Sequence, residues 1–144
     1  MDLPETLLPA RLLERATLRG RERAWPISEI PDVIEAARLA NLVNAGGQLQ
    51  FRIPAGETCE CYWVEVDTVR SVSPDLSWPA RVEQTAAAAR SQFQSLQERY
   101  NFIAEGRSAF GDYLNEYEAS GGNVRDALCF VWYVEAKPRV SDRA

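Results

Sequence analysis

Residues 48–67 alternate between apolar and polar side chains in a pattern that predicts a β-hairpin. If Ile53 pairs with Cys59 across the loop 54–58, one face of the hairpin is entirely apolar. The same register places Arg52 opposite Glu60 on the other face, where the two would form a cross-strand ion pair. The apolar face would consist of Leu49, Phe51, Ile53, Cys59, Cys61 and Trp63.

Apolar residues at helical spacing predict about four helices around this hairpin. The first is expected near residues 8–18. The second is expected to begin after Pro26, with Ser28 as its N-cap, and to end at residues 44–47. The third has the strongest pattern, because six apolar side chains fall on one stripe of a helix. These six are Val82, Ala86, Ala89, Phe93, Leu96 and Tyr100.

A fourth helix is predicted by a further group of apolar side chains, and glycines at 121 and 122 close it. We expect this helix to pack antiparallel against the third. Asn123 is expected to cap a single helical turn through Asp126. The apolar side chains of the fourth helix are Phe110, Tyr113, Leu114 and Tyr117.

Residues 128–135 are apolar on both alternating faces, which predicts a central strand covered on both sides. The simplest sheet pairs this strand with residues 59–67, and a parallel pairing is also open. The fold class is therefore α+β, with a small, mainly antiparallel sheet of the hairpin 48–67 and the strand 128–135. We expect residues 1–136 to form one domain and residues 137–144 a polar C-terminal tail.

Charge and composition narrow the possible functions. The 144-residue chain has a formal net charge of −5, which disfavours nucleic acid and favours a basic protein partner. No apolar run approaches the roughly 20 residues that cross a bilayer, and the first residues lack the basic flank of a secretion signal. We therefore expect a cytoplasmic protein without a membrane partner. Five arginines crowd residues 11–23, where we expect an exposed face; a local anionic contact is the alternative.

The chain contains no histidine and one lysine, which removes the commonest general base and argues against an enzyme. Residues 45–48 lack the spacing of a phosphate-binding loop, so no cofactor is predicted. Cys59, Cys61 and Cys129 are interpreted as core residues. The alternative is a zinc site, although neither CxxC pairs nor a histidine accompanies them.

Three segments, 19–26, 46–51 and 129–135, resemble those of small bacterial proteins of unknown function. The resemblance covers most of the chain. It implies a bacterial cytoplasmic protein and carries over no activity, cofactor or site residue.

Together these features favour a non-enzymatic protein-binding module, such as an inhibitor or immunity protein that acts on a bacterial toxin. Its candidate contact residues are Arg52, Glu60 and Tyr62, on the polar face of the hairpin. The alanine-rich half of the third helix suits a homodimer seam as well as a core seam.

The alternative function is a small-molecule binder or a carboxylate-based hydrolase with an aromatic-lined cleft. Its candidate residues are Trp25, Trp78, Glu65 and Asp67. The two carboxylates would act there as an acid and a base.

Overall fold

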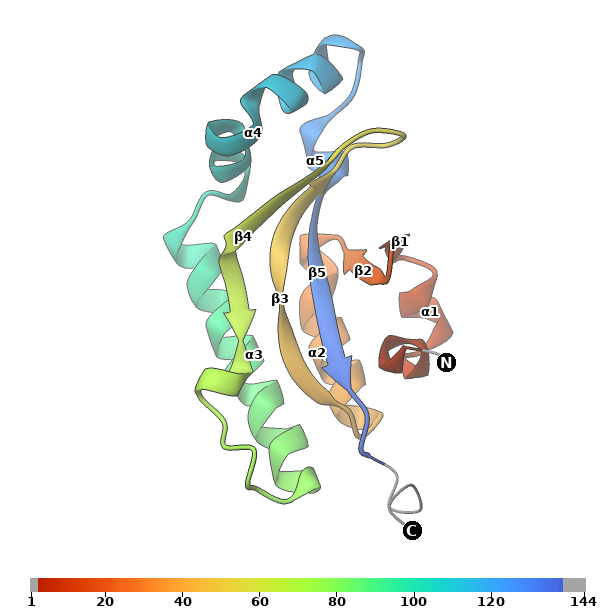
Figure 1. The fold of residues 1–144 in the computed structure, drawn as a ribbon, viewed down its shortest axis with the longest axis vertical. Coiled ribbons are helices and arrows are strands. Elements are labelled where there is room, and N and C mark those ends of the chain that lie inside the picture. Colours follow the sequence, from red (N-terminus) through yellow and green to blue (C-terminus); the bar gives the residue numbers. More distant parts are fainter. Residues whose placement is uncertain (1–2, 139–144) are drawn as a thin grey trace.

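The computed structural model describes residues 3–138, and Figure 1 shows their fold. Within this range five antiparallel strands form one sheet in the order β1-β2-β5-β3-β4, which confirms the predicted α+β class. The strands are β1 (Thr17–Arg19), β2 (Glu22–Trp25), β3 (Val43–Arg52), β4 (Thr58–Asp67) and β5 (Leu128–Glu135). Most of the predicted tail, residues 139–144, lies outside the described range.

The helices are short at both ends of the chain and long in its middle. None of those formed by residues 3–138 combines the length and the hydropathy needed to cross a bilayer. The α-helices are α1 (Ala10–Leu13), α2 (Ile30–Leu39), α3 (Trp78–Arg99), α4 (Phe102–Ala119) and α5 (Val124–Ala127). The 3-10 helices are η1 (Pro4–Leu7), η2 (Ile27–Glu29) and η3 (Thr68–Arg70).

The hairpin β3–β4 forms as predicted but in a register shifted by two residues. Phe51, and not Ile53, pairs with Cys59. The loop causes this shift in register. The Gly56 amide donates to Ile53 O (2.9 Å), so Ile53 is the first residue of a tight turn and does not pair with Cys59. A shift of two keeps every side chain on its predicted face, so the apolar face is largely conserved. The predicted Arg52–Glu60 ion pair is wrong, since Arg52 now lies opposite Thr58.

A β-bulge in β4 changes the pattern near the middle of the hairpin. Gln48 pairs with Glu65, whereas the next residue of β3 pairs with Cys61. Residues 62–64 therefore have no partner on β3, and the alternation of faces is interrupted there. Trp63 is 38% exposed as a result, so the prediction that it is buried with the hairpin's apolar face is wrong.

Strand β5 occupies the centre of the sheet, as predicted, between β2 and β3. Its expected pairing with residues 59–67 is wrong, because β3 lies between β5 and β4. The backbones of β3 and β5 come very close at Gly47, where an added Cβ would lie 2.9 Å from the carbonyl carbon of Val131 and 2.9 Å from Trp132 Cε3. Residues 46 and 47 are therefore strand glycines and not a turn that ends the second helix; α2 ends at Leu39.

Helices α2 and α3 cover one face of the sheet, behind the strands in Figure 1. The stripe predicted for the third helix is confirmed, with Tyr100 as the C-cap residue of α3. The proposed Ser28 cap is absent, because the side chains at the starts of η2 and α2 accept no capping hydrogen bond.

The predicted antiparallel pairing of the third and fourth helices is wrong. Asn101 caps a new helix through its Oδ1, which accepts the Ala104 amide (3.0 Å), so α4 starts at once after α3. Helix α4 then continues past the end of α3 toward the β3–β4 loop (Figure 1), while α2 is the helix that packs beside α3. The predicted Asn123 cap of the short α5 is confirmed.

The N-terminal segment is the largest departure from the sequence prediction. Only Ala10–Leu13 of the expected helix 8–18 is helical, and Arg19, Arg21 and Arg23 of the arginine-rich segment lie in the hairpin β1–β2. Arg52 of β3 donates to Thr17 O (2.6 Å) on β1 and to Glu22 O (3.1 Å) on β2. Because β5 separates β3 from β2 in the sheet, this hairpin must bend over the face opposite to α2 and α3.

Candidate functional site

Arg52 is a structural residue of the sheet. It is only 5% exposed, and its guanidinium also donates to Gln50 Oε1 (2.9 Å) and Thr17 Oγ1 (3.0 Å). Burial lowers its pKa, because the charged form loses contact with water. Of the three contact residues predicted from the sequence, Arg52 is therefore not available at the surface.

Glu60 and Tyr62 remain exposed on β4. The Glu60 carboxylate accepts a hydrogen bond from Gln50 Nε2 (3.2 Å), and Tyr62 is 68% exposed. The Tyr62 ring meets the Trp63 ring edge-on, with 5.4 Å between their centroids. The Trp63 indole donates to Glu105 Oε1 (2.8 Å) on α4, which fixes its orientation at the surface. We refer to Glu60, Tyr62, Trp63 and Glu105 as the edge patch.

The sequence missed Trp63 as a surface residue because simple alternation assigns it to the core. The bulge that turns it outward depends on the pairing of β4 with β3, which is not visible in either strand alone. The informative feature is that two large aromatic rings lie next to each other at the surface of an edge strand, because contiguous exposed apolar patches mark interaction sites more than single exposed residues do.

The four residues of the alternative cleft do not form one. Trp25 has no exposed surface, and its indole donates to Leu12 O (2.8 Å) inside the core. Glu65 and Asp67 both face Arg70, at 3.6 Å and 3.2 Å.

Trp78 lies at the start of α3. Its indole donates to Asn41 O (2.9 Å), which ties α3 to the end of α2. The guanidinium of Arg81 lies 5.2 Å from the centre of its ring. These contacts explain Trp78 as a packing residue at a helix end.

All three cysteines are free and buried. Burial raises the pKa of Cys61 to about 12 and that of Cys129 to about 11, and it raises the pKa of Cys59 as well. The thiols are therefore protonated at neutral pH, as expected of core residues. In residues 3–138, no group of three cysteine or carboxylate side chains is arranged to hold a metal ion.

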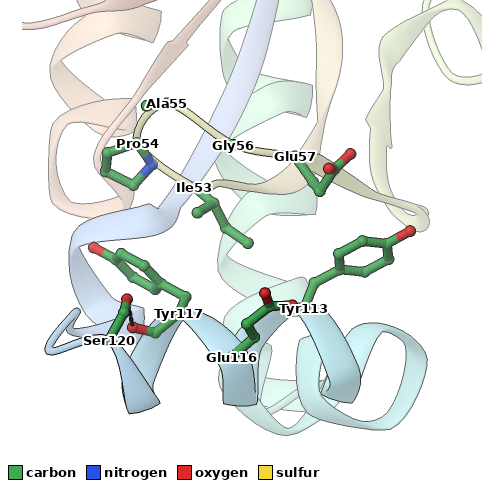
Figure 2. A pocket seen from close by; sticks show the side chains of 9 residues that line it. All are labelled: Ile53, Pro54, Ala55, Gly56, Glu57, Tyr113, Glu116, Tyr117 and Ser120. Atoms are coloured by element: carbon green, nitrogen blue, oxygen red, sulfur yellow. Dashed lines mark hydrogen bonds between the residues drawn. The ribbon is translucent and has the colours of Figure 1, made fainter.

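A pocket of about 300 Å³ lies between the β3–β4 loop and the second half of α4 (Figure 2). We call it the hairpin-tip pocket. Two tyrosines and two glutamates stand around an apolar floor. Its lining consists of Ile53, Pro54, Ala55, Gly56, Glu57, Tyr113, Glu116, Tyr117 and Ser120.

A kink in α4 shapes the helical wall of this pocket. The backbone of Phe110 leaves helical geometry, with φ −132° and ψ 35°. The kink brings Arg107 within 2.7 Å and 2.9 Å of the two carboxylate oxygens of Glu118. In a straight helix, eleven residues span roughly 16 Å along the axis, so this bidentate pair requires the bend. The apolar pattern of the fourth helix does not predict the kink, and Tyr113 is 47% exposed.

Comparison with known proteins assigns no family to this chain. No family model matches it, and no curated protein or solved structure is significantly similar to it. Function must therefore be argued from the two surface features, the edge patch and the hairpin-tip pocket.

Proposed function

We propose that the chain is a non-enzymatic protein-binding module of the bacterial cytoplasm, and that it holds a basic partner protein as an inhibitor or immunity protein holds a toxin. The edge patch carries this proposal. It presents Tyr62 and Trp63 side by side at the surface, and these residue types dominate the binding energy of protein interfaces. The Trp63 indole is already fixed by Glu105, so little conformational entropy is lost when a partner covers it.

Charge favours a basic partner. The chain has a net charge of −5; Glu60 precedes Tyr62 by two residues on β4, and Glu105 accepts the hydrogen bond of the Trp63 indole. Opposite potentials on two partners speed their encounter and disfavour partners of the wrong charge. An acidic patch with an aromatic centre therefore suits a partner that presents arginine or lysine around an apolar site.

We expect the partner to bind the side chains of β4 and not to add a further strand to its backbone edge. Although β4 is an edge strand, Gln92 of α3 covers its end at Asp67. The Asp67 amide donates to Gln92 Oε1 (2.8 Å), and Gln92 Nε2 donates to Asp67 O (3.2 Å). The bulge at residues 62–64 interrupts the rest of the edge, as bulges on natural edge strands do.

The proposal can be tested by affinity purification of the tagged protein from its native host. Wild type is compared with Tyr62→Ala/Trp63→Ala and with the control Leu39→Ala/Val69→Ala, which removes two exposed apolar side chains outside the patch. We expect wild type and control to retain a stoichiometric basic protein and the patch variant to lose it. Equal retention by all three would refute the role of the patch. A tightly bound small molecule without a protein partner would favour the ligand-binding alternative.

A further inference from the structure

The walls of the hairpin-tip pocket come from two segments that are far apart in sequence. Residues Tyr113, Glu116 and Tyr117 share one face of α4, because side chains three and four apart are neighbours on a helix. Figure 2 shows Ile53 pointing from the hairpin toward this face, between the two tyrosines, with Glu57 on the same side as Tyr113. The pocket thus combines an apolar floor, two aromatic rings and two carboxylates.

The loop wall is held in place from its far side. Arg19 of β1 donates through Nη2 to Ile53 O (2.6 Å) and through Nη1 to Glu57 O (3.1 Å) and Thr58 Oγ1 (2.8 Å). The Ile53 amide also donates to Glu57 O (3.0 Å), which closes the loop on itself. A loop fixed in this way presents the Glu57 side chain without a large ordering cost on binding.

The helical wall is fixed as well. The Arg107–Glu118 pair spans the kink, and Ser120 Oγ donates to Tyr117 O (2.7 Å). Gly122 packs against the Tyr117 ring so closely that an added Cβ would lie 2.5 Å from Tyr117 Cδ1. Glycine at this position therefore allows the ring to keep its place in the pocket wall.

The charges of the pocket are uncompensated within the described residues. The carboxylates of Glu57 and Glu116 take part in none of the ion pairs formed by residues 3–138, and none of the nine lining residues is basic. Arg19, the neighbouring cation, faces the loop carbonyls behind Glu57. A ligand with an apolar stem and a planar cation matches this lining, because guanidinium stacks on aromatic rings and bonds carboxylates in a bidentate manner.

We infer that the hairpin-tip pocket receives an arginine side chain of the partner protein. The methylene stem packs on Ile53 and Tyr117, and the guanidinium reaches Glu57 and Glu116. This inference rests on the proposed function and gives the basic partner a specific anchor. Volume permits it, since about 300 Å³ accommodates one long side chain.

The test is an NMR titration of the ¹⁵N-labelled chain with acetyl-Gly-Arg-Gly-amide. We expect saturable amide shifts in residues 53–57 and 113–120. The same peptide with citrulline, which is neutral and nearly isosteric with arginine, should bind at least tenfold more weakly. The variant Glu57→Gln/Glu116→Gln should show the same loss with the arginine peptide. Its control, Glu14→Gln/Glu98→Gln, changes the net charge equally at two exposed positions outside the pocket and should bind like wild type.

Three results would overturn the inference. Equal weakening in both double variants would indicate nonspecific attraction, and equal binding of the citrulline peptide would show that no cation is recognised. Tighter binding of propylguanidinium than of the peptide would assign the pocket to a small cation and not to a protein side chain.

The inference and the proposed function fail in different ways. If Glu57→Gln/Glu116→Gln retains the captured partner as well as wild type does, the pocket is not the anchor and protein binding stands. If the arginine peptide binds at the pocket but no partner is captured, the proposed function fails while recognition of arginine by the pocket stands.

Discussion

Two glycines of α4 allow a matched test of how this helix is packed. An added Cβ at Gly106 would lie 2.5 Å from Cζ and 2.9 Å from Cδ1 of Phe51, a ring with no exposed surface. At Gly111 the same atom meets nothing within 4 Å. Gly106 lies within the first segment of α4, whereas Gly111 directly follows the kink at Phe110, so the gain in helix propensity on Gly→Ala is at most as large at Gly111 as at Gly106.

The expected free energies follow from two opposed effects. Alanine stabilises a helix interior by about 1 kcal/mol relative to glycine, which is the upper limit for Gly111→Ala beside the kink, where no steric cost opposes it. At Gly106 the new methyl group must displace a packed ring, and overpacking of this kind costs about 1–3 kcal/mol. We expect Gly111→Ala to raise the free energy of unfolding by up to about 1 kcal/mol and Gly106→Ala to lower it by up to about 2 kcal/mol.

The measurement is urea denaturation with linear extrapolation for wild type and both variants. Because the helix gain at Gly111 is at most that at Gly106, the difference between the two variants gives a lower limit to the cost of displacing Phe51. In the background Phe51→Leu, which shortens the side chain facing Gly106, Gly106→Ala should be much less destabilising. If both glycine variants raise stability equally, α4 does not pack on Phe51 as described, and the helical wall of the hairpin-tip pocket is misplaced.

Two further predictions concern buried polar and ionisable groups. Arg52→Met should lower the free energy of unfolding by about 2–3 kcal/mol, because it breaks charged hydrogen bonds that hold β1–β2 over the sheet. Urea denaturation measures this loss beside the exposed control Arg70→Met, and equal free energies of unfolding for the two variants would refute the prediction. The raised pKa values of Cys61 and Cys129 mean that the folded chain holds these protons more tightly than the unfolded chain, so stability should be full below pH 9 and decline as the pH rises toward 11. Cys61→Ala/Cys129→Ala should show a smaller decline between pH 8 and pH 10.5, and an unchanged pH slope would contradict the assignment.

The hairpin β3–β4 shows which features of a fold can be predicted from the sequence. Alternation identifies the faces of a strand, and a shift of two residues leaves them unchanged, so Phe51 and Cys61 are buried as predicted. The register depends on the loop, where Ala55 adopts φ 54° and the turn closes at Gly56. A loop with a non-glycine residue at positive φ is not evident from alternation.

The hairpin β1–β2 was missed for a different reason. Its strands have three and four residues, which is too short for a recognisable period. They are stabilised by pairing with β5 and by the bonds of Arg52 to Thr17 and Glu22, contacts that span up to 107 residues. The preceding leucines at helical spacing pointed to a helix that is only four residues long.

The same arginines connect the fold to the charge of its surface. Sequence patterning assigned Arg19 to a solvated charge run and Arg52 to a surface ion pair, yet both donate to backbone carbonyls of neighbouring strands and loops. Neither guanidinium forms an ion pair among residues 3–138, because their donors are taken up by carbonyl oxygens. Glu57 and Glu60 therefore remain as exposed negative charges at the hairpin, where each could meet a basic partner. The bonds of Arg19 and Arg52 that join β1–β2 to the hairpin thus leave Glu57 and Glu60 without an ion-pair partner among the described residues, and no sequence pattern predicts that result.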